Sequence, residues 1–338
     1  MHKVKLAVIG LGKMGLSHLS IAGAHENVTV VGICDSSKIV TDFLEKFSPF
    51  PCFTDYRKMI QAVQPDAVIV ATPTKYHYEI ILYLLQQHIH VFSEKPFTLH
   101  PKDSDHLTQL AHQHKLVNQV GYHNQFLGTF MEMKRLIKNG VLGKIQHFTG
   151  EAYGPVMIKE KEKTWRSDAS EGGGCLMDYA SHVIDLINGC LGNITATNGC
   201  LLKKIYSKNV EDAVYALLQL STGVSGVLSV NWSDESFRKM STQLTVQGSN
   251  GKLICDATEL KVFLKTKDES GNYTKGWNSK TVGDLQLPVD FYLRGEEYSA
   301  QLDYFVQTIG HKVPNTINTF EQAAKTDLAI QIIQLSNR

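Results

Sequence analysis

The first thirty-five residues constrain the fold more than any other part of the chain. An apolar run from Val4 to Ile9 leads directly into Gly10-Leu11-Gly12-Lys13-Met14-Gly15, and a segment of helical length follows. A β-branched run over residues 28–33 then leads to Asp35, twenty residues after Gly15. Strand, glycine turn, helix, strand and acidic residue, in this order, predict a dinucleotide-binding unit.

Each glycine of this turn has a physical role. Gly10 permits the tight turn after the strand, Gly12 lets the backbone approach a pyrophosphate, and Gly15 lets helix and strand pack closely. Amides at the start of the helix then face the phosphates. Asp35 would accept hydrogen bonds from the adenosine ribose and repel a 2′-phosphate, so NAD is the expected cofactor and NADP the less favoured one. Ser36 and Lys38 would soften this preference.

Length and composition describe an ordinary two-domain protein. The 338 residues exceed one hydrophobic core, and a net charge of +1 offers no basic field for nucleic acid or an anionic membrane. The start Met1-His2-Lys3-Val4 runs into the first strand, which leaves no signal peptide, and no apolar run reaches the length of a membrane span. A cytoplasmic protein is expected, with its six cysteines as packing thiols. The histidines near residues 100–114 have no metal-ligand spacing, so no metal is expected.

The order of predicted elements defines the fold class. Strand-like runs at 66–71, 89–93 and 116–121 alternate with helix-like segments at 78–85 and 104–114. This alternation predicts an N-terminal Rossmann domain, a doubly wound parallel sheet over residues 1–121. A C-terminal α/β domain over residues 122–338, with a large, mostly antiparallel sheet, should follow. Its expected helices are 129–138, 177–188, 299–309 and 320–335. The last helices are candidates for packing back on the first domain. Its expected strands are 144–153, 197–206, 212–220, 224–231, 241–247 and 252–256.

Ligands of an open parallel sheet bind at the carboxyl ends of its strands, and three such ends carry informative residues. Thr72, Pro73 and His77 follow one strand as a wall for adenosine and ribose. Glu94-Lys95-Pro96 follows the next, where the proline favours projection into the cleft. Tyr122-His123-Asn124-Gln125 follows the third. The expected cofactor contacts are Gly10, Leu11, Gly12, Lys13, Met14, Gly15, Asp35, Ser36, Thr72, Pro73, His77, Glu94 and Lys95.

A glycine run in the second domain precedes a second group of chemically active residues. Gly172-Gly173-Gly174 allows close backbone approach, and the predicted helix after it places Asp178 and His182 four residues apart on one face. Asp178 can orient the imidazole or hold a substrate hydroxyl, and His182 can exchange a proton.

The ordered combination of these motifs resembles the glucose-fructose oxidoreductase and inositol dehydrogenase family, called Gfo/Idh/MocA. The resemblance implies a Rossmann domain, a sheet-rich substrate domain that forms the oligomer contact, and NAD(P)-dependent redox chemistry on sugars or polyols. It also implies that Lys95, Asp178 and His182 are the catalytic residues, and that Trp165-Arg166 corresponds to the aromatic and basic residues before the glycine run. Many members carry an arginine after the fifth strand, where this chain has Asn124-Gln125.

We therefore predict an oxidoreductase that moves a hydride between nicotinamide and a secondary alcohol or ketone of a sugar, sugar derivative or cyclic polyol. Lys95 would orient the hydroxyl and neutral His182 would remove its proton, with Tyr153 or Lys95 as the alternative base. Residues 154–170 are a candidate lid, and Trp232 is either a platform for a sugar face or a core residue. The predicted substrate contacts are Asn124, Tyr153, Trp165, Arg166, Asp178, His182 and Trp232.

Two other functions remain compatible with the sequence. One is a redox-neutral epimerase or eliminase, in which NAD oxidises the sugar transiently and is then restored. The other is an NAD-sensing protein without catalysis, which the three catalytic residues argue against. The expected partners are a small sugar or polyol and other copies of the chain, as a homodimer or homotetramer, with no nucleic acid and no membrane.

Overall fold

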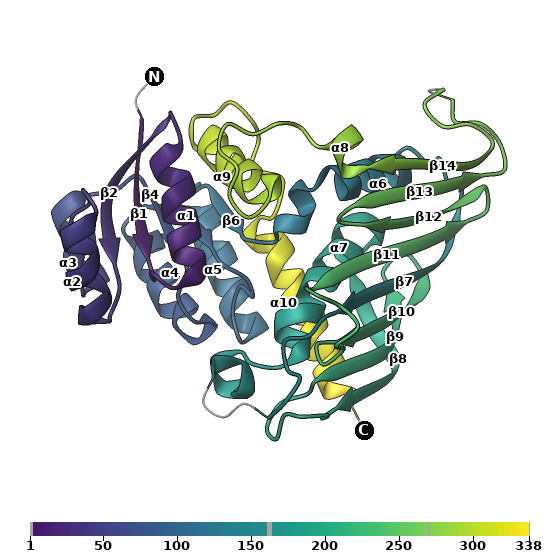
Figure 1. The fold of residues 1–338 in the computed structure, drawn as a ribbon, viewed down its shortest axis with the longest axis horizontal. Helices are drawn as coiled ribbons and strands as arrows, with labels where there is room; N and C mark the ends of the chain where they lie inside the picture. The colour runs from purple at the N-terminus through teal and green to yellow at the C-terminus, as the bar shows by residue number, and fades with distance from the viewer. Residues whose placement is uncertain (1–2, 161–163, 270, 338) are drawn as a thin grey trace. The chain divides into compact units, whose positions relative to one another are not determined.

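The chain folds into two units that differ in the kind of sheet they contain (Figure 1). The computed structural model describes residues 3–160, 164–269 and 271–337. The first unit comprises Met1–His123 and Pro288–Ala324, and the second comprises Asn124–Leu287 and Lys325–Arg338. The chain therefore enters the second unit, returns to the first, and ends in the second. A single boundary at residue 121 does not describe this division.

The first unit is built on a six-stranded parallel sheet in the order β3-β2-β1-β4-β5-β6. Strands β1 and β4 are neighbours although β2 and β3 lie between them in sequence, so the strand order reverses beside β1. This is the topology in which ligands bind at the reversal point. The strands are β1 Val4–Ile9, β2 Val28–Cys34, β3 Cys52–Phe53, β4 Ala67–Val70, β5 His90–Ser93 and β6 Asn118–Val120.

Helices cover both faces of this sheet, which explains why its central strands are apolar throughout. All four residues of β4 are buried. One core contains side chains of α1 and α9, and the other contains side chains of α3, α4 and α5 together with Phe320 at the start of α10. The helices are α1 Lys13–Ala24, α2 Lys38–Phe47, α3 Tyr56–Val63, α4 His77–Gln86, α5 Pro101–Gln113 and α9 Glu296–Ile309. Helix α10 Phe320–Leu335 begins in this unit, and its residues from Lys325 onward belong to the second unit.

The second unit is built on an eight-stranded sheet in the order β14-β13-β12-β11-β7-β10-β9-β8. Neighbouring strands pair antiparallel except β7 and β10, which pair parallel. The turns at 221–223 and 248–251 join antiparallel neighbours, so the predicted fold class is confirmed. The strands are β7 Ile145–Tyr153, β8 Ile194–Lys203, β9 Ala213–Leu220, β10 Ser225–Asn231, β11 Ser241–Gly248, β12 Gly251–Asp256, β13 Glu259–Leu264 and β14 Gly276–Thr281.

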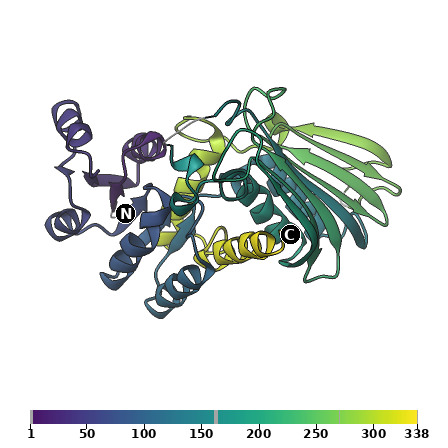
Figure 2. The same cartoon turned by 90° about the horizontal axis from the view of Figure 1, so that it is seen from below.

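One face of this sheet packs on helices α6 Gly128–Lys138 and α7 Ser181–Leu191, and the opposite face is open in the described chain (Figure 2). Alternate residues of β9 are buried and exposed. A Cβ at Gly150 would lie 2.5 Å from Val183 and 3.0 Å from Ile187, so this strand and α7 are in close contact. The second unit also contains the short helix α8 Val282–Leu285.

Some elements have no clear sequence signal. Helices α2 and α3 and the short strand β3 were not predicted, and neither were strand β13 and the edge strand β14. Strand β14 has the sequence Gly-Trp-Asn-Ser-Lys-Thr, which lacks an apolar alternation because the strand lies at the sheet edge. Among the described residues, no helix combines the length and the apolar character that crossing a membrane requires.

Candidate functional site

The three glycines of the first turn meet three different surroundings. Gly10 has φ +89°, and a Cβ there would lie 2.7 Å from backbone atoms of Ala71. A Cβ at Gly15 would lie 1.7 Å from the carbonyl oxygen of Gly10, so only glycine lets α1 pack this closely on the turn. Gly12 is different, because a Cβ there meets no atom within 4 Å. The open space beside Gly12, at the N-terminus of α1, is where a pyrophosphate would fit.

Asp35 is held at the end of β2 by two backbone amides. Its Oδ2 accepts a hydrogen bond from the amide of Leu11 at 2.7 Å, and its Oδ1 accepts one from Ser37 at 2.9 Å. Each carboxylate oxygen retains a further lone pair for a ribose hydroxyl. Lys13 and Ser36 are exposed beside this turn, and Met14 is half-buried.

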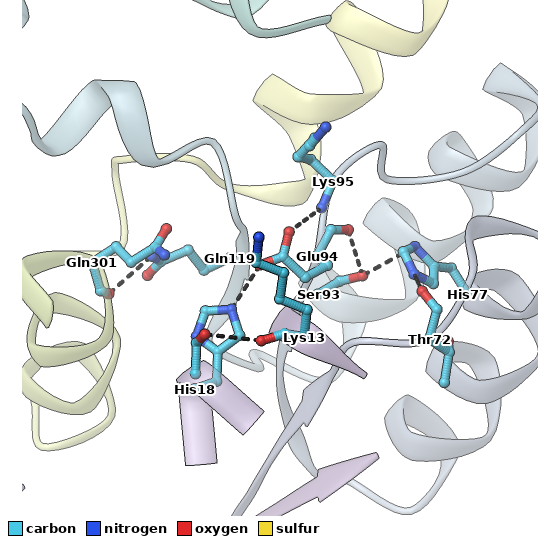
Figure 3. Close-up of polar contacts among 10 residues, drawn as sticks. Lys13, His18, Thr72, His77, Ser93, Glu94, Lys95, Gln119 and Gln301 are labelled. Atoms are coloured by element: carbon cyan, nitrogen blue, oxygen red, sulfur yellow. Dashed lines mark hydrogen bonds and ion pairs between the residues drawn. The ribbon is translucent and has the colours of Figure 1, made fainter. Parts of the chain in front are cut away.

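His77 does not line an open surface, which corrects its assignment as a cofactor contact. Its ring is fully buried, with Nε2 2.9 Å from the carbonyl oxygen of Thr72 and Nδ1 3.1 Å from those of Pro96 and Phe97. Burial lowers its pKa below the usual histidine range, although the surrounding carbonyls oppose this. His77 therefore joins the loop after β4 to the loop after β5 (Figure 3), while Thr72 is half-buried and Pro73 is exposed.

Glu94 also differs from its prediction, because its carboxylate points inward rather than into a cleft. Its Oε1 lies 2.6 Å from Nε2 of the buried His18, and its Oε2 accepts a hydrogen bond from the amide of Lys95 at 3.2 Å (Figure 3). Burial alone would raise the pKa of Glu94, but His18 and Lys95 outweigh it and hold the pKa below the usual glutamate value. The side chain of the half-buried Lys95 extends away from this pair (Figure 3).

In the second unit, the glycine run brings Trp165 and Arg166 to the start of the next helix. A Cβ at Gly173 would lie 2.5 Å from the carbonyl oxygens of both residues, so the glycine allows backbone to pack on backbone. Nε of Arg166 then donates a hydrogen bond to Oδ2 of Asp178 at 2.9 Å. The guanidinium also lies over the ring of Trp165, 4.4 Å from its centroid. These three predicted residues form one cluster.

The helix that carries Asp178 and His182 is not a regular α-helix at its start. Residues Leu176–Ala180 form a π-helical turn, and α7 begins at Ser181. The expectation of an α-helical four-residue spacing is wrong here, because Asp178 lies in the wider π turn and His182 in the α-helix. Both side chains are buried, at 5% and 3% exposure. Single π turns within helices occur frequently at functional sites.

Three further predicted contacts have different surroundings. Asn124 is buried, and its Nδ2 has no hydrogen-bond partner among the residues that the structure describes. Trp232 is a core residue, fully buried with its indole N–H donating to Asp212 at 2.6 Å, so it offers no face to a sugar. Tyr153 alternates with the buried Ala152 and lies on the open face of the sheet, opposite α7, so it is neither a substrate contact nor an alternative base in this unit.

Sequence reasoning missed His18, Asp185 and Tyr298. His18 lies one helical turn after Gly15, a spacing that would have signalled an inward position. Nε2 of Gln125 donates to Oδ2 of Asp185 at 2.8 Å. Burial raises the pKa of Asp185 to about 7, and Gln125 and Lys134 oppose this only partly.

The ring of Tyr298 stacks on the ring of His123, with centroids 4.7 Å apart. The two residues are 175 positions apart, so this contact has no local sequence signal. Of the predicted lid 154–170, residues 161–163 lie outside the described residues.

The parallel sheet order, the glycine turn and the acidic residue at the end of β2 define a dinucleotide-binding protein. Comparison with known proteins agrees with this class. Residues 4–122 match the oxidoreductase family with an NAD-binding Rossmann fold, GFO_IDH_MocA, and residues 130–254 match the GFO/IDH/MocA C-terminal domain. The chain belongs to the Gfo/Idh/MocA family of oxidoreductases.

Relatives and solved structures of this family cover most of the chain. D-glucoside 3-dehydrogenase of Escherichia coli is 27% identical over 258 residues, which are 69% of this chain and 70% of the relative. Myo-inositol 2-dehydrogenase of Thermotoga maritima is 23% identical over 280 residues, 80% of each chain. A structure of levoglucosan dehydrogenase with NADH and levoglucosan is 19% identical, has a TM-score of 0.86, and covers 99% of this chain and 97% of its own. At that identity the structural match shows the fold.

Proposed function

We propose that this protein is an NAD-dependent dehydrogenase that moves a hydride between nicotinamide and a secondary alcohol or ketone of a sugar, sugar derivative or cyclic polyol. The observation that carries the proposal is the cluster in which Trp165 and Arg166 contact Asp178, four residues before His182, in a chain with an NAD-binding Rossmann unit. A binding protein without catalysis has no need of a buried acid that is held by an arginine four residues before a buried histidine.

The first unit fits NAD. The open space at Gly12 leaves room for a pyrophosphate beside the amides of α1, and the carboxylate of Asp35 is fixed at the end of β2 for the ribose hydroxyls. The same carboxylate would repel the 2′-phosphate of NADP. When bound, NAD supplies the hydride acceptor, and the residues of this chain supply binding, orientation and proton transfer.

Each catalytic residue has a separate task in this proposal. Neutral His182 takes the proton of the substrate hydroxyl as the hydride leaves the same carbon. Asp178, held by Arg166, accepts a hydrogen bond from a neighbouring hydroxyl and orients the sugar. Lys95 directs its ammonium group to the reacting oxygen, where a positive charge favours the alkoxide that forms.

The substrate class follows from the polar and aromatic groups near this helix. Trp165 offers a half-buried ring to an apolar sugar face, and the buried amide of Asn124 can donate to a hydroxyl. Asn124 and Gln125 stand where many family members have an arginine, so an uncharged sugar suits this position better than a phosphorylated one. The relatives named for D-glucoside and myo-inositol substrates agree with a neutral polyol ring.

We also propose that copies of the chain associate through the open face of the eight-stranded sheet. Leu201, Tyr215 and Leu217 are exposed together on the neighbouring strands β8 and β9, and Trp277 is exposed on β14 at the opposite edge of the sheet. Monomeric proteins rarely expose such patches. The six free cysteines suit a reducing compartment such as the cytosol, and the net charge of +1 offers nothing to nucleic acid.

The deciding experiment follows NADH formation with a panel of free sugars, glycosides, inositols and sugar phosphates. Oxidation of one neutral class supports the proposal. Product formation without net NADH would instead identify the redox-neutral function. NAD binding without any sugar conversion would identify the sensor.

A further inference from the structure

A buried hydrogen bond between His18 and Glu94 in the first unit connects the glycine-turn helix to the lysine of the proposed active site. We propose that His18 and Glu94 are positioning residues, which hold the backbone of Lys95 at a fixed position relative to α1. The cofactor pyrophosphate would bind at the N-terminus of this helix. This inference rests on the proposed function, because it concerns the lysine assigned to the reacting oxygen. Neither residue would touch the substrate.

The first step concerns the contacts that hold the ring of His18. His18 lies on α1, one turn after Gly15, and its ring is completely buried. The ring contacts Phe92 of β5 edge-on, with centroids 5.0 Å apart and planes at 63°. Its Nε2 lies 2.6 Å from Oε1 of Glu94, while Nδ1 has no hydrogen-bond partner among the described residues. The polar contact of this ring is therefore directed to Glu94.

The second step is the confinement of the Glu94 carboxylate. Its second oxygen accepts a hydrogen bond from the amide of Lys95 at 3.2 Å. A Cβ at Gly121, just after β6, would lie 3.2 Å from both carboxylate oxygens, so the backbone there closes the remaining side. Figure 3 shows the contacts of the carboxylate with His18 of α1 and with the amide of Lys95, and the backbone at Gly121 adds a third side.

The third step concerns the charge of the Glu94 carboxylate. The ionisable side chains that act electrostatically with Glu94 come from several elements: His18 on α1, His77 on α4, Lys95 after β5, His123 after β6 and Tyr298 on α9. Burial lowers the pKa of His123 to about 4, so that ring is neutral at neutral pH. Glu94 is ionised there, and hydrogen bonds to an ionised acceptor are shorter and stronger than those between neutral groups.

These contacts form a continuous link from the N-terminus of α1 to Lys95. Helix α1 begins beside Gly12, where the pyrophosphate would lie, and the His18–Glu94 bond transfers the position of the helix to the amide of Lys95. A shift of about 1 Å in a catalytic group costs about 10²-fold in rate. Loss of the link should therefore lower turnover without removing any group that contacts NAD.

The test compares substitutions at His18 with a matched pair elsewhere on the same helix. His25 also pairs with a carboxylate, Asp303, at 3.2 Å, but it lies at the other end of α1. His18→Phe keeps the ring and removes the donor, His18→Gln keeps an amide donor, and His25→Phe is the control. The double variant His18→Phe/Glu94→Gln removes the buried charge, which guards against a variant that fails to fold.

Three quantities are measured for each variant: kcat on the sugar that the panel identifies, the NADH dissociation constant from fluorescence, and the acylation rate of Lys95 relative to the exposed Lys102. We expect kcat to fall by about 10²-fold in His18→Phe and in the double variant, to recover at least tenfold in His18→Gln, and to stay unchanged in His25→Phe. NADH affinity should stay constant, and Lys95 should be acylated faster when it is less well held.

Unchanged kcat and unchanged Lys95 reactivity in His18→Phe would overturn the inference, and so would an equal loss in His25→Phe. If no sugar is oxidised by the unmodified protein, the proposed function fails. The acylation rates still decide the positioning role in that case, because they require no substrate.

Discussion

Nε of Arg166 donates a hydrogen bond to Oδ2 of Asp178 at 2.9 Å, which fixes a buried carboxylate from a residue twelve positions earlier in the chain. The contact depends on the glycine run between them, since a side chain at Gly173 would push the Trp165–Arg166 backbone away. An exposed ion pair contributes little to stability. This pair is different in kind, because the carboxylate is only 6% exposed and belongs to the proposed catalytic set.

Arg166→Ala should therefore lower kcat/KM by about 10²-fold, because Asp178 loses the group that orients it. Arg166→Lys should lower kcat/KM less than Arg166→Ala does, because lysine keeps the positive charge although it lacks the planar guanidinium group. Arg135→Ala is the matched control, as Arg135 pairs with Glu132 at 2.6 Å on α6. Steady-state kinetics of the three variants check this, and an equal effect at Arg135 would contradict it.

The two glycines of the turn should respond in opposite ways to alanine. Gly15→Ala places a methyl group against the carbonyl of Gly10, and should destabilise the fold by about 1–3 kcal/mol or prevent folding. Gly12→Ala places its methyl in open space, and should change the free energy of unfolding by less than about 0.5 kcal/mol while it weakens NADH binding. Thermal unfolding and NADH fluorescence measure both, and a stable Gly15→Ala protein would refute the packing argument.

The cofactor preference should depend on Asp35. NAD should bind more tightly than NADP, and Asp35→Ser should narrow the difference, because the substitution removes the carboxylate that repels a 2′-phosphate. Calorimetry with both cofactors measures the ratio of dissociation constants. Equal or tighter NADP binding by the unmodified protein would exclude this role for Asp35.

Asp185 should make stability depend on pH. Its folded pKa is raised to about 7, whereas an unfolded aspartate has a pKa of about 3.9. Between these values the folded protein binds the additional proton, so the free energy of unfolding should fall as pH rises from about 4 to about 7 and then level off. Asp185→Asn should remove this part of the slope. Urea unfolding of both proteins at about pH 5 and about pH 8 gives the change in the free energy of unfolding between these pH values. An identical change in the two proteins would show that Asp185 is not responsible for it.

His182 separates catalysis from ligand sensing. Sugar oxidation should accelerate as pH rises through the range in which an imidazole loses its proton, because only the neutral ring accepts one. His182→Ala should lower kcat by about 10²–10⁴-fold with NAD affinity almost unchanged, the usual result of losing a general base. Full activity of this variant across pH would show that another residue is the proton acceptor.

Local sequence determined the central parallel strands of the first unit, although α2, α3 and β3 were not predicted and residues 288–324 were assigned to the second domain. The spacing of Gly10, Gly12 and Gly15 specifies the turn, because a side chain at Gly10 or Gly15 would collide with backbone atoms. The apolar runs predicted the parallel strands, since strands buried on both faces carry little polar sequence. The alternating strands and their turns likewise predicted the antiparallel sheet. These features depend on neighbours in sequence, and short-range sterics and burial are enough to infer them.

Tertiary structure alone decided which polar groups meet. His18 and Glu94 are 76 positions apart, and Gln125 and Asp185 are 60 apart, so no local pattern indicates either pair. The same reason applies to the corrected residues: His77 and Trp232 are buried by segments that the sequence could not place beside them, and Tyr153 lies on the open sheet face because of its strand register. A sequence states which groups are present, whereas their partners, burial and pKa values depend on packing between distant segments.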